Sequence, residues 1–264
     1  MSRFTLMVEE SYVSIDGGIE VTGDLFGEPE IGEQVYIQVP GHVPVTGNVF
    51  SVTEIEKIAK RVRVKMVISN MPMNAEISKY TVVTNIVPSK DASDADLVEN
   101  SMILGLSYGF LKNIEDPDFQ NIIMHEIVAG SYLTKVFFQE DKMTDNPNLS
   151  TNPGVGFIAL PLPTDKTKKV LPLYTDMEAL KLMPKSPEVK EEGNVMLARF
   201  EEAYAIMRNR NYHAVVINPF GPAALFVPSA MMDNLHVIVL KMQAAMEEEK
   251  KAAEEKAAEA KKDE

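Results

Sequence analysis

The sequence contains no cysteine and no tryptophan among its 264 residues. The absence of cysteine excludes disulfides, cysteine nucleophiles, iron–sulfur clusters and thiolate zinc sites. Positive charge is also scarce, because 26 Lys and Arg residues face 39 Asp and Glu residues and leave a net charge of −13. Such a charge repels phosphate backbones and anionic lipid surfaces. We therefore expect no DNA partner and no membrane partner, and the charge disfavours RNA or the ribosome.

Long apolar runs are missing as well. No window approaches the ~18 uninterrupted apolar residues that a membrane-spanning helix requires. The N-terminal residues MSRFTLMVEE contain no extended apolar segment, so we expect no signal peptide. Together with the lack of cysteine, this predicts a cytoplasmic protein.

Residues 3–88 have the pattern of short β-strands. Apolar and polar residues alternate along 34–39 and along 61–67, and glycine or proline interrupts the pattern about every ten residues. This rhythm predicts a small closed barrel or a sandwich over residues 1–88.

The same region resembles the second, β-barrel domain of translational GTPases such as elongation factor Tu. The resemblance is carried by Val8-Glu9-Glu10, Gly17-Gly18, Val21-Thr22-Gly23, Ile31-Gly32-Glu33-Gln34-Val35 and Ser51-Val52-Thr53-Glu54-Ile55. It implies a barrel that docks on other macromolecules. No Gly-x-x-x-x-Gly-Lys-Ser/Thr motif occurs in the sequence, so nucleotide switching is not implied.

The second part of the chain mixes helical and strand patterns. A polar linker over 89–96 precedes residues whose periodicity predicts a helix over 94–112 and another from Asp118 to Gly130. We further expect strands at 132–138, 156–162, 169–174, 213–217 and 224–227, a helix over 192–208, and a last helix that begins at Ser229. The β-branched run 236–239 leaves a short strand open as the alternative there. Residues 241–264 are almost entirely Ala, Glu and Lys, which predicts a charged tail that is either helical or disordered.

Residues 97–240 resemble the SseB family, named for enhanced serine sensitivity. The resemblance is carried by the segments NSMILGLSYGFLKN, FQNIIMHEIVAGSYLTKVFF, VLPLYTDMEALKLM and VVINPFGPAALFVPS. It implies an α/β domain with helices packed on a mixed sheet, and it implies no catalytic mechanism. The predicted fold class is therefore multidomain α+β, with a small N-terminal β-barrel, an SseB-like α/β domain and a charged helical tail.

The turn Asn218-Pro219-Phe220-Gly221-Pro222 lies between two apolar runs. Pro219 favours extended backbone at Asn218, and Gly221 permits a positive φ, so we expect the turn mainly to fix the direction of the chain. A binding role is the alternative, because Tyr174, Thr175 and Asn218 each follow a predicted strand and neighbouring strands would place them on one rim. The candidate ligand- or partner-binding residues are Tyr174, Thr175, Asn218, Pro219 and Gly221.

A basic patch is predicted on the barrel. Arg61, Arg63 and Lys65 alternate along one strand and therefore share a face, and Lys57 lies shortly before them. A solvated outer face is the plain interpretation of this patch. The alternative is a contact with RNA or an acidic protein, although no aromatic residues are interleaved for base stacking.

Three patterns have the residue types of a catalytic or metal-binding site but lack the required spacing or context. Gly105-Leu106-Ser107-Tyr108-Gly109 matches the nucleophile elbow of α/β-hydrolases, but it falls within a helical pattern rather than between a strand and a helix. The four histidines lack metal-ligand spacing, and the acidic residues 115–118 fit a helix stop and N-cap better than a calcium loop. We predict no catalytic residues, no metal site and no cofactor.

These observations predict a non-enzymatic binding or regulatory protein that recognises a protein partner or a small polar ligand. The alternative hypothesis is a translation-associated factor whose barrel docks on the ribosome, tRNA or a translation factor. A hydrolase or transferase is a further possibility that activity screening would test.

Overall fold

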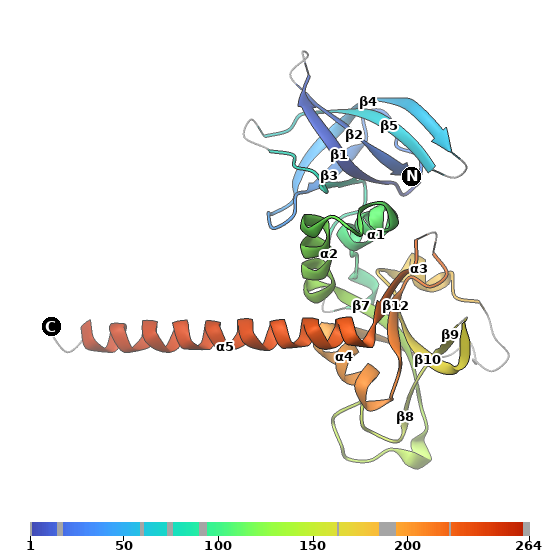
Figure 1. Ribbon diagram of the computed structural model, residues 1–264, viewed down its shortest axis with the longest axis vertical. Helices are drawn as coiled ribbons and strands as arrows, with labels where there is room; N and C mark the ends of the chain where they lie inside the picture. The colour runs from blue at the N-terminus through green and yellow to red at the C-terminus, as the bar shows by residue number, and fades with distance from the viewer. Residues whose placement is uncertain are drawn as a thin grey trace.

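The computed structural model consists of a β-barrel and an α/β part, with two helices between them (Figure 1). It describes residues 2–14, 18–58, 61–72, 76–89, 94–162, 164–184, 194–221 and 223–260. Several predicted features fall outside these residues, namely part of the linker, Pro222 and the end of the tail. No helix of the described part is long and apolar enough to cross a bilayer.

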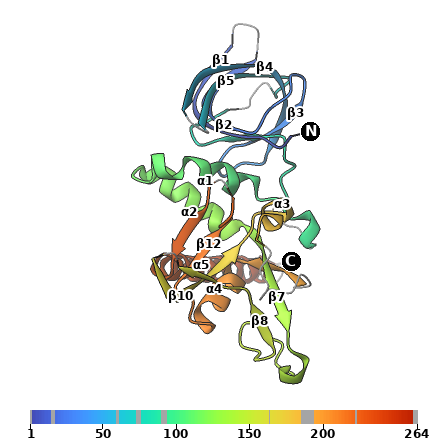
Figure 2. The ribbon, with the colours of Figure 1, turned by 90° about the vertical axis from the view of Figure 1, so that its right-hand side faces the viewer.

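Six antiparallel strands close the barrel in the order β1-β2-β5-β4-β3-β6. Figure 2 shows the barrel as a closed ring. They are β1 Thr5–Val13, β2 Ile19–Phe26, β3 Gln34–Gln38, β4 Val45–Ile58, β5 Arg61–Ser69 and β6 Val82–Thr84. The alternating apolar side chains of these strands fill the barrel with a core of Leu, Ile, Val, Met and Phe residues. The predicted barrel is therefore confirmed.

The α/β part contains two small sheets, ordered β13-β12-β10-β9 and β11-β7-β8. Its strands are β7 Ser131–Phe138, β8 Val155–Phe157, β9 Leu160–Leu162, β10 Asp165–Leu173, β11 Asn194–Arg199, β12 Ala214–Ile217 and β13 Leu225–Pro228. Its helices are α1 Ser101–Asn113, α2 Pro117–Ala129, α3 Met177–Lys181, α4 Phe200–Asn209 and α5 Ser229–Ala260, with short 3-10 turns at Ala95–Leu97 and Glu140–Lys142. Strands β10 and β12 run parallel while the other pairs are antiparallel, so the predicted mixed sheet with packed helices is confirmed.

The helix predicted over 94–112 begins later than its periodicity suggested. Glu99 forms backbone bridges to Ser89 on one side and to Asp176 on the other, so the chain is still extended there. The α-helix α1 starts only at Ser101. The bridge to Asp176 joins residues far apart in the sequence, which the local pattern could not reveal.

The prediction of a helix over 192–208 is wrong for the residues before Phe200 that the structure describes. Residues Asn194–Arg199 form β11, which pairs antiparallel with β7, and only Phe200–Asn209 form a helix. The apolar spacing of Met196, Phe200, Tyr204 and Met207 spans both elements. Pairing with the open edge of β7 supplies backbone hydrogen bonds that override the helical spacing of the side chains.

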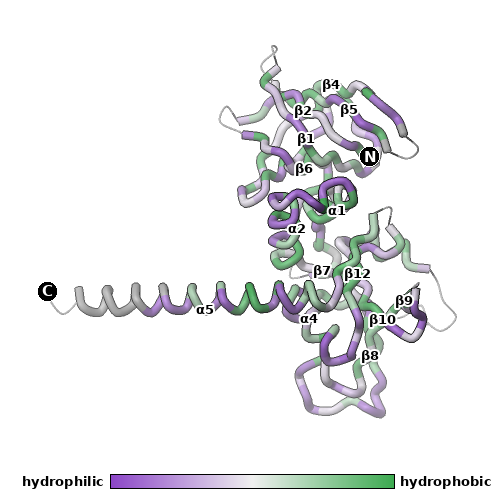
Figure 3. Tube along the Cα trace, in the orientation of Figure 1, coloured by the Kyte–Doolittle hydropathy of each residue, from purple (hydrophilic) through white to green (hydrophobic). Residues whose placement is uncertain are grey.

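The last helix, α5, is continuous from Ser229 to Ala260, so the alternative strand at 236–239 is excluded. Leu235 is buried against the body, whereas Met242 and Met246 are exposed because the helix has left the body there. Figure 1 shows α5 projecting from the α/β part, and Figure 3 shows hydrophobic and hydrophilic segments alternating along it.

One hydrophobic core connects the barrel to the rest of the molecule. Met7, Tyr80 and Val82 of the barrel belong to the same buried cluster as residues of α1, α2, α4 and α5. The two predicted domains are thus joined by shared apolar packing.

Candidate functional site between the barrel and the helices

Helix α1 lies directly against the barrel through its two glycines. A Cβ atom at Gly105 would lie 2.6 Å from both methyl groups of Val82, and a Cβ atom at Gly109 would overlap the end of the Met7 side chain. Phe26 stacks on Tyr108 beside them, with ring centroids 3.4 Å apart. The small residues of the Gly-Leu-Ser-Tyr-Gly segment therefore allow close approach of a helix to a sheet.

The same segment does not form a nucleophile elbow. Ser107 lies in the middle of α1, is buried, and donates its hydroxyl hydrogen to the carbonyl oxygen of Ile103 at 2.7 Å. A nucleophile elbow needs a sharp turn between a strand and a helix, with the hydroxyl exposed. The hydrolase hypothesis loses the motif on which it rested.

Polar contacts tie the barrel to the α/β part at three further places. Arg3 contacts Glu99 and, at 3.1 Å, Asp176. Glu9 pairs with Lys112 of α1, and Asp116 accepts hydrogen bonds from Tyr80 at 2.6 Å and from Lys79 at 2.9 Å. Most of these groups are partly buried, which makes their charge-assisted bonds stronger than ordinary surface pairs.

Asp116 also caps helix α2, in agreement with the N-cap predicted within residues 115–118. Its side chain accepts hydrogen bonds from the backbone N–H groups of Asp118 and Phe119, and Pro117 occupies the first turn. The Tyr80 hydroxyl, the Lys79 ammonium and these N–H groups hold the pKa of Asp116 well below its usual range. One carboxylate thus positions α2 relative to the barrel.

The predicted rim of Tyr174, Thr175 and Asn218 is brought together, but in the interior. The backbone N–H of Thr175 donates to Oδ1 of Asn218 at 3.0 Å, and Nδ2 of Asn218 donates to the Thr175 hydroxyl at 2.9 Å. Thr175 and Tyr174 are fully buried, and Asn218 is 2% exposed. Burial raises the pKa of Tyr174, whose hydroxyl has no hydrogen-bond partner within the described residues. Thr175 and Asn218 are thus bonded to each other, and the three buried side chains present no polar rim to solvent.

The turn that follows differs from the prediction in its backbone. Asn218 itself adopts a left-handed conformation with φ of 51°, whereas Gly221 does not have a positive φ. Asn adopts this region more readily than most residues, and hydrogen bonds to Thr175, 43 residues earlier in the chain, hold its side chain in place. The N–H of Gly221 donates to the carbonyl oxygen of Asn218 at 2.9 Å and closes the turn behind Pro219.

This turn supports the contact between the two halves of the molecule. The Thr175 hydroxyl donates to Oδ2 of Asp176 at 2.7 Å, while Oδ1 of Asp176 caps α3 at the N–H of Ala179 and accepts Arg3. A chain of hydrogen bonds thus runs from Asn218 through Thr175 and Asp176 to Arg3, which precedes the first barrel strand.

Two of the four residues of the predicted basic patch are paired with carboxylates. Arg63 pairs with Glu9 at 2.8 Å, and Lys65 pairs with Glu20 at 3.2 Å. Lys57 is exposed on β4, and the side chain of Arg61 lies outside the described residues. Because Glu9 and Glu20 neutralise Arg63 and Lys65, these two cations attract RNA only weakly. The alternative of a translation-associated factor therefore gains no support from this patch.

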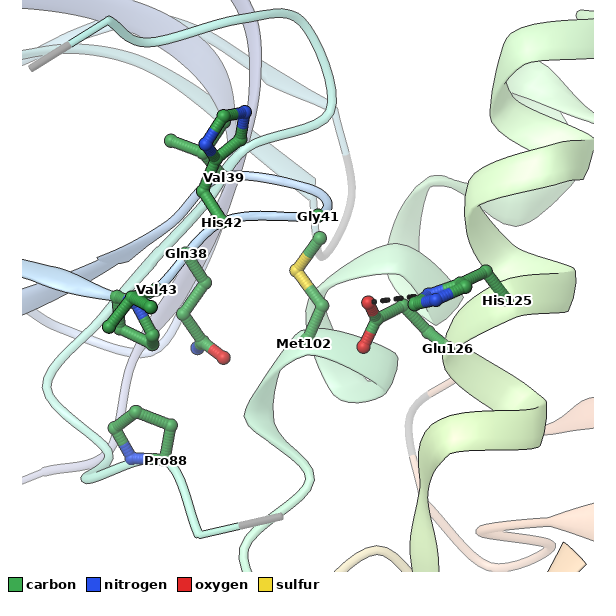
Figure 4. A pocket seen from close by; sticks show the side chains of 10 residues that line it. Gln38, Val39, Gly41, His42, Val43, Pro88, Met102, His125 and Glu126 are labelled. Carbon is green, nitrogen blue, oxygen red and sulfur yellow. Dashed lines mark hydrogen bonds and ion pairs between the residues drawn. The ribbon is translucent and has the colours of Figure 1, made fainter. Parts of the chain in front are cut away.

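A cleft of about 500 Å³ opens between the barrel and α2 (Figure 4). Its barrel side is the loop between β3 and β4, which contributes Val39, Gly41, His42, Val43 and Pro44 next to Gln38. The other side is formed by Met102 of α1 and by His125 and Glu126 of α2, and Pro88 completes the wall. Figure 4 shows Gln38, Met102 and Glu126 directed toward the space between the two sides.

The cleft combines apolar walls with a carboxylate. Glu126 is only 3% exposed, and its Oε1 lies 3.4 Å from Nδ1 of His125. Gln38 donates to the Ser101 hydroxyl at 2.7 Å, which holds the barrel side in place. Val43 is 84% exposed at the mouth. Such a site suits a side chain or ligand with an aliphatic stem and a cationic end.

The sequence analysis did not single out this cleft. A signal was present, because Glu126 lies three residues after Ile123 and next to Ile127, on the apolar face of its helix. A carboxylate on such a face points to a special environment. The barrel loop that completes the cleft comes from residues far away in the sequence.

The architecture defines a barrel joined to a mixed α/β domain. Residues 116–234 match the model of the SseB protein N-terminal domain family. The matched residues run from the start of α2 to the beginning of α5. This match covers less than half of the chain and supports the predicted SseB-like domain. None of the curated proteins that were compared matches the chain. The resemblance of the barrel to elongation factor Tu stays a prediction.

Proposed function

We propose that this chain is a non-enzymatic binding protein that recognises a partner protein at the cleft between its barrel and its SseB-type domain. The partner inserts a lysine or arginine side chain whose stem packs on the apolar walls and whose charge faces Glu126. The observation that carries this proposal is the position of Glu126, a buried carboxylate that lines a cleft built by both halves of the molecule.

The construction of the interface supports a preformed recognition site. The cleft is bordered by elements that shared apolar packing and the Gln38–Ser101 hydrogen bond hold together. Preformed clefts lose less entropy on binding than flexible ones, and ligand sites occur preferentially at such boundaries. The net charge of −13 additionally attracts cationic partners over a distance.

The experiment places a photo-crosslinking amino acid at position 43, at the mouth of the cleft. The matched control places it at position 31, which is 76% exposed on the barrel. We expect one or a few proteins to crosslink at position 43 and not at position 31. Introducing Glu126→Gln should reduce this crosslinking, while Glu10→Gln on the barrel should leave it unchanged.

Equal crosslinking at positions 31 and 43, or crosslinking that Glu126→Gln does not change, would contradict the proposal. Circular dichroism and thermal unfolding establish first that each variant is folded. Catalytic turnover of any substrate in a broad activity screen of the purified chain would contradict the non-enzymatic part of the proposal.

A further inference from the structure

A second, polar pocket of about 340 Å³ lies in the SseB-type domain, apart from the cleft. Three segments line it: the start of β10, the connection from α4 to β12, and the first residue of α5. The lining residues are Thr167, Lys168, Lys169, Arg208, Arg210, Asn211, Tyr212, His213 and Ser229. Four of them carry a permanent positive charge, and none is a carboxylate.

The backbone fixes these segments next to one another. The N–H of His213 donates to the carbonyl oxygen of Lys169 at 2.7 Å, and the N–H of Ser229 donates to that of His213 at 3.2 Å. Asn211 turns the chain between α4 and β12 in a left-handed conformation with φ of 54°. The cations are thus held around one space by the pairing of β10 with β12, although they are far apart in the sequence.

The contacts of the four cations differ. Arg210 is structural, because its Nη2 donates to the carbonyl oxygens of Asn152 at 2.8 Å and Val155 at 2.7 Å. Lys168 and Arg208 each approach one carboxylate outside the lining, Asp165 at 3.6 Å and Asp233 at 3.4 Å. Lys169 has no carboxylate partner within the described residues.

Hydrogen-bond donors accompany this charge. The side chains of Asn211, His213 and Ser229 have no hydrogen-bond partner in the part of the chain that the structure describes. The Thr167 hydroxyl, in contrast, already donates to Asp165 at 2.6 Å. The pocket therefore offers lysine and arginine N–H groups, an amide and a serine hydroxyl from three directions.

We propose that this pocket binds the phosphate group of a small phosphorylated molecule. A phosphate presents three strongly accepting oxygens and up to two negative charges, which matches several donors that converge with excess positive charge. A carboxylate offers only two oxygens and one charge. The volume also exceeds what one phosphate needs and leaves room for the rest of a small ester. In a chain with a net charge of −13, this concentration of cations without a lining carboxylate is a local exception.

The test is calorimetric titration of the purified full chain with phenyl phosphate and with inorganic phosphate at low ionic strength. We expect saturable binding of the ester, tighter than that of inorganic phosphate, and weakening as sodium chloride is added. Lys169→Glu should weaken binding of the ester at least about tenfold, because it replaces an attractive charge by a repulsive one. Ser229→Ala should weaken it by a smaller factor.

The matched control is Lys181→Glu, which reverses an exposed lysine on α3 and should leave the affinity unchanged. Equal affinity for ester and inorganic phosphate would overturn the assignment to a phosphate ester in favour of free phosphate. No saturable binding up to concentrations on the order of 10 mM, or equal weakening by both lysine reversals, would overturn the site itself.

Discussion

Asn218 and Asp116 show how single polar residues position large parts of this molecule. Asn218 accepts an unusual backbone conformation and uses both ends of its amide on Thr175. Asp116 combines a helix cap with bonds to Lys79 and Tyr80 on the barrel. In both cases, one side chain joins segments that are distant in the sequence, and Asp116 also accepts hydrogen bonds from the first N–H groups of its own helix.

The depressed pKa of Asp116 predicts an acid-sensitive contribution to stability. Because the folded state holds this carboxyl group ionised more strongly than the unfolded state, its stabilisation is present above the unfolded pKa of about 3.9 and is lost as the pH falls toward the folded value. Asp116→Asn should therefore lose less free energy of unfolding than the parent protein between roughly pH 5 and pH 2.5. Urea denaturation at each pH measures this difference.

Asp118→Asn is the matched control for this prediction. Asp118 lies in the same helical turn, but its side chain makes no bond to the described residues of the barrel, so this variant should follow the pH dependence of the parent protein. Identical pH dependence in Asp116→Asn and the parent would contradict the assigned role.

At the scale of elements, α1 is defined by what it packs against. Its sequence contains two glycines, which weaken an isolated helix by about 1 kcal/mol each relative to alanine. The structure gives the reason, since Gly105 faces the branched side chain of Val82 and Gly109 faces the flexible end of Met7. The two glycines therefore differ in how much additional volume their surroundings tolerate.

This difference predicts unequal losses of stability for two alanine substitutions. Gly105→Ala should lower the free energy of unfolding by roughly 1–3 kcal/mol, because the stiff Val82 side chain cannot move away and the helix must shift. Gly109→Ala should cost much less, because Met7 can rearrange and the helix gains propensity. Denaturant unfolding of both variants measures the contrast, and a stabilising Gly105→Ala would show that α1 does not pack as described.

At the scale of the whole molecule, the barrel and the α/β part share a core. Met7, Tyr80 and Val82 are buried together with residues of α1 and α2, and Arg3 and Glu9 add ion pairs across the same boundary. Apolar burial of this kind makes the stability of each half depend on the other. The cleft lies between the two halves, so its shape and its proposed function depend on this shared core.

We expect the full chain to unfold in one cooperative transition. Differential scanning calorimetry should give a single peak whose calorimetric enthalpy equals the van 't Hoff enthalpy. Two resolved transitions, or a calorimetric enthalpy well above the van 't Hoff value, would show that the halves unfold independently and that their shared core contributes little.

The elements that could be predicted are those with a strong local signal. Alternation of apolar and polar residues along 34–39 and 61–67 indicated barrel strands, and an N-cap was expected within residues 115–118, because a capping side chain acts within three residues. Residues 194–199 were assigned wrongly because their spacing fits a helix while their backbone pairs with β7, some sixty residues earlier. Thr175 and Asn218 were expected to meet, but their burial depends on what covers them.

The sequence by itself determined the barrel, the mixed α/β class, the caps and the excess of negative charge, because these depend on composition and on neighbours a few residues apart. Only the tertiary structure decided that α1 lies against the barrel, that Glu126 faces a cleft and that Lys169 and Ser229 surround a polar pocket. These features arise where segments distant in the chain come together, and the free energy of such contacts depends on shape and burial that no local pattern contains.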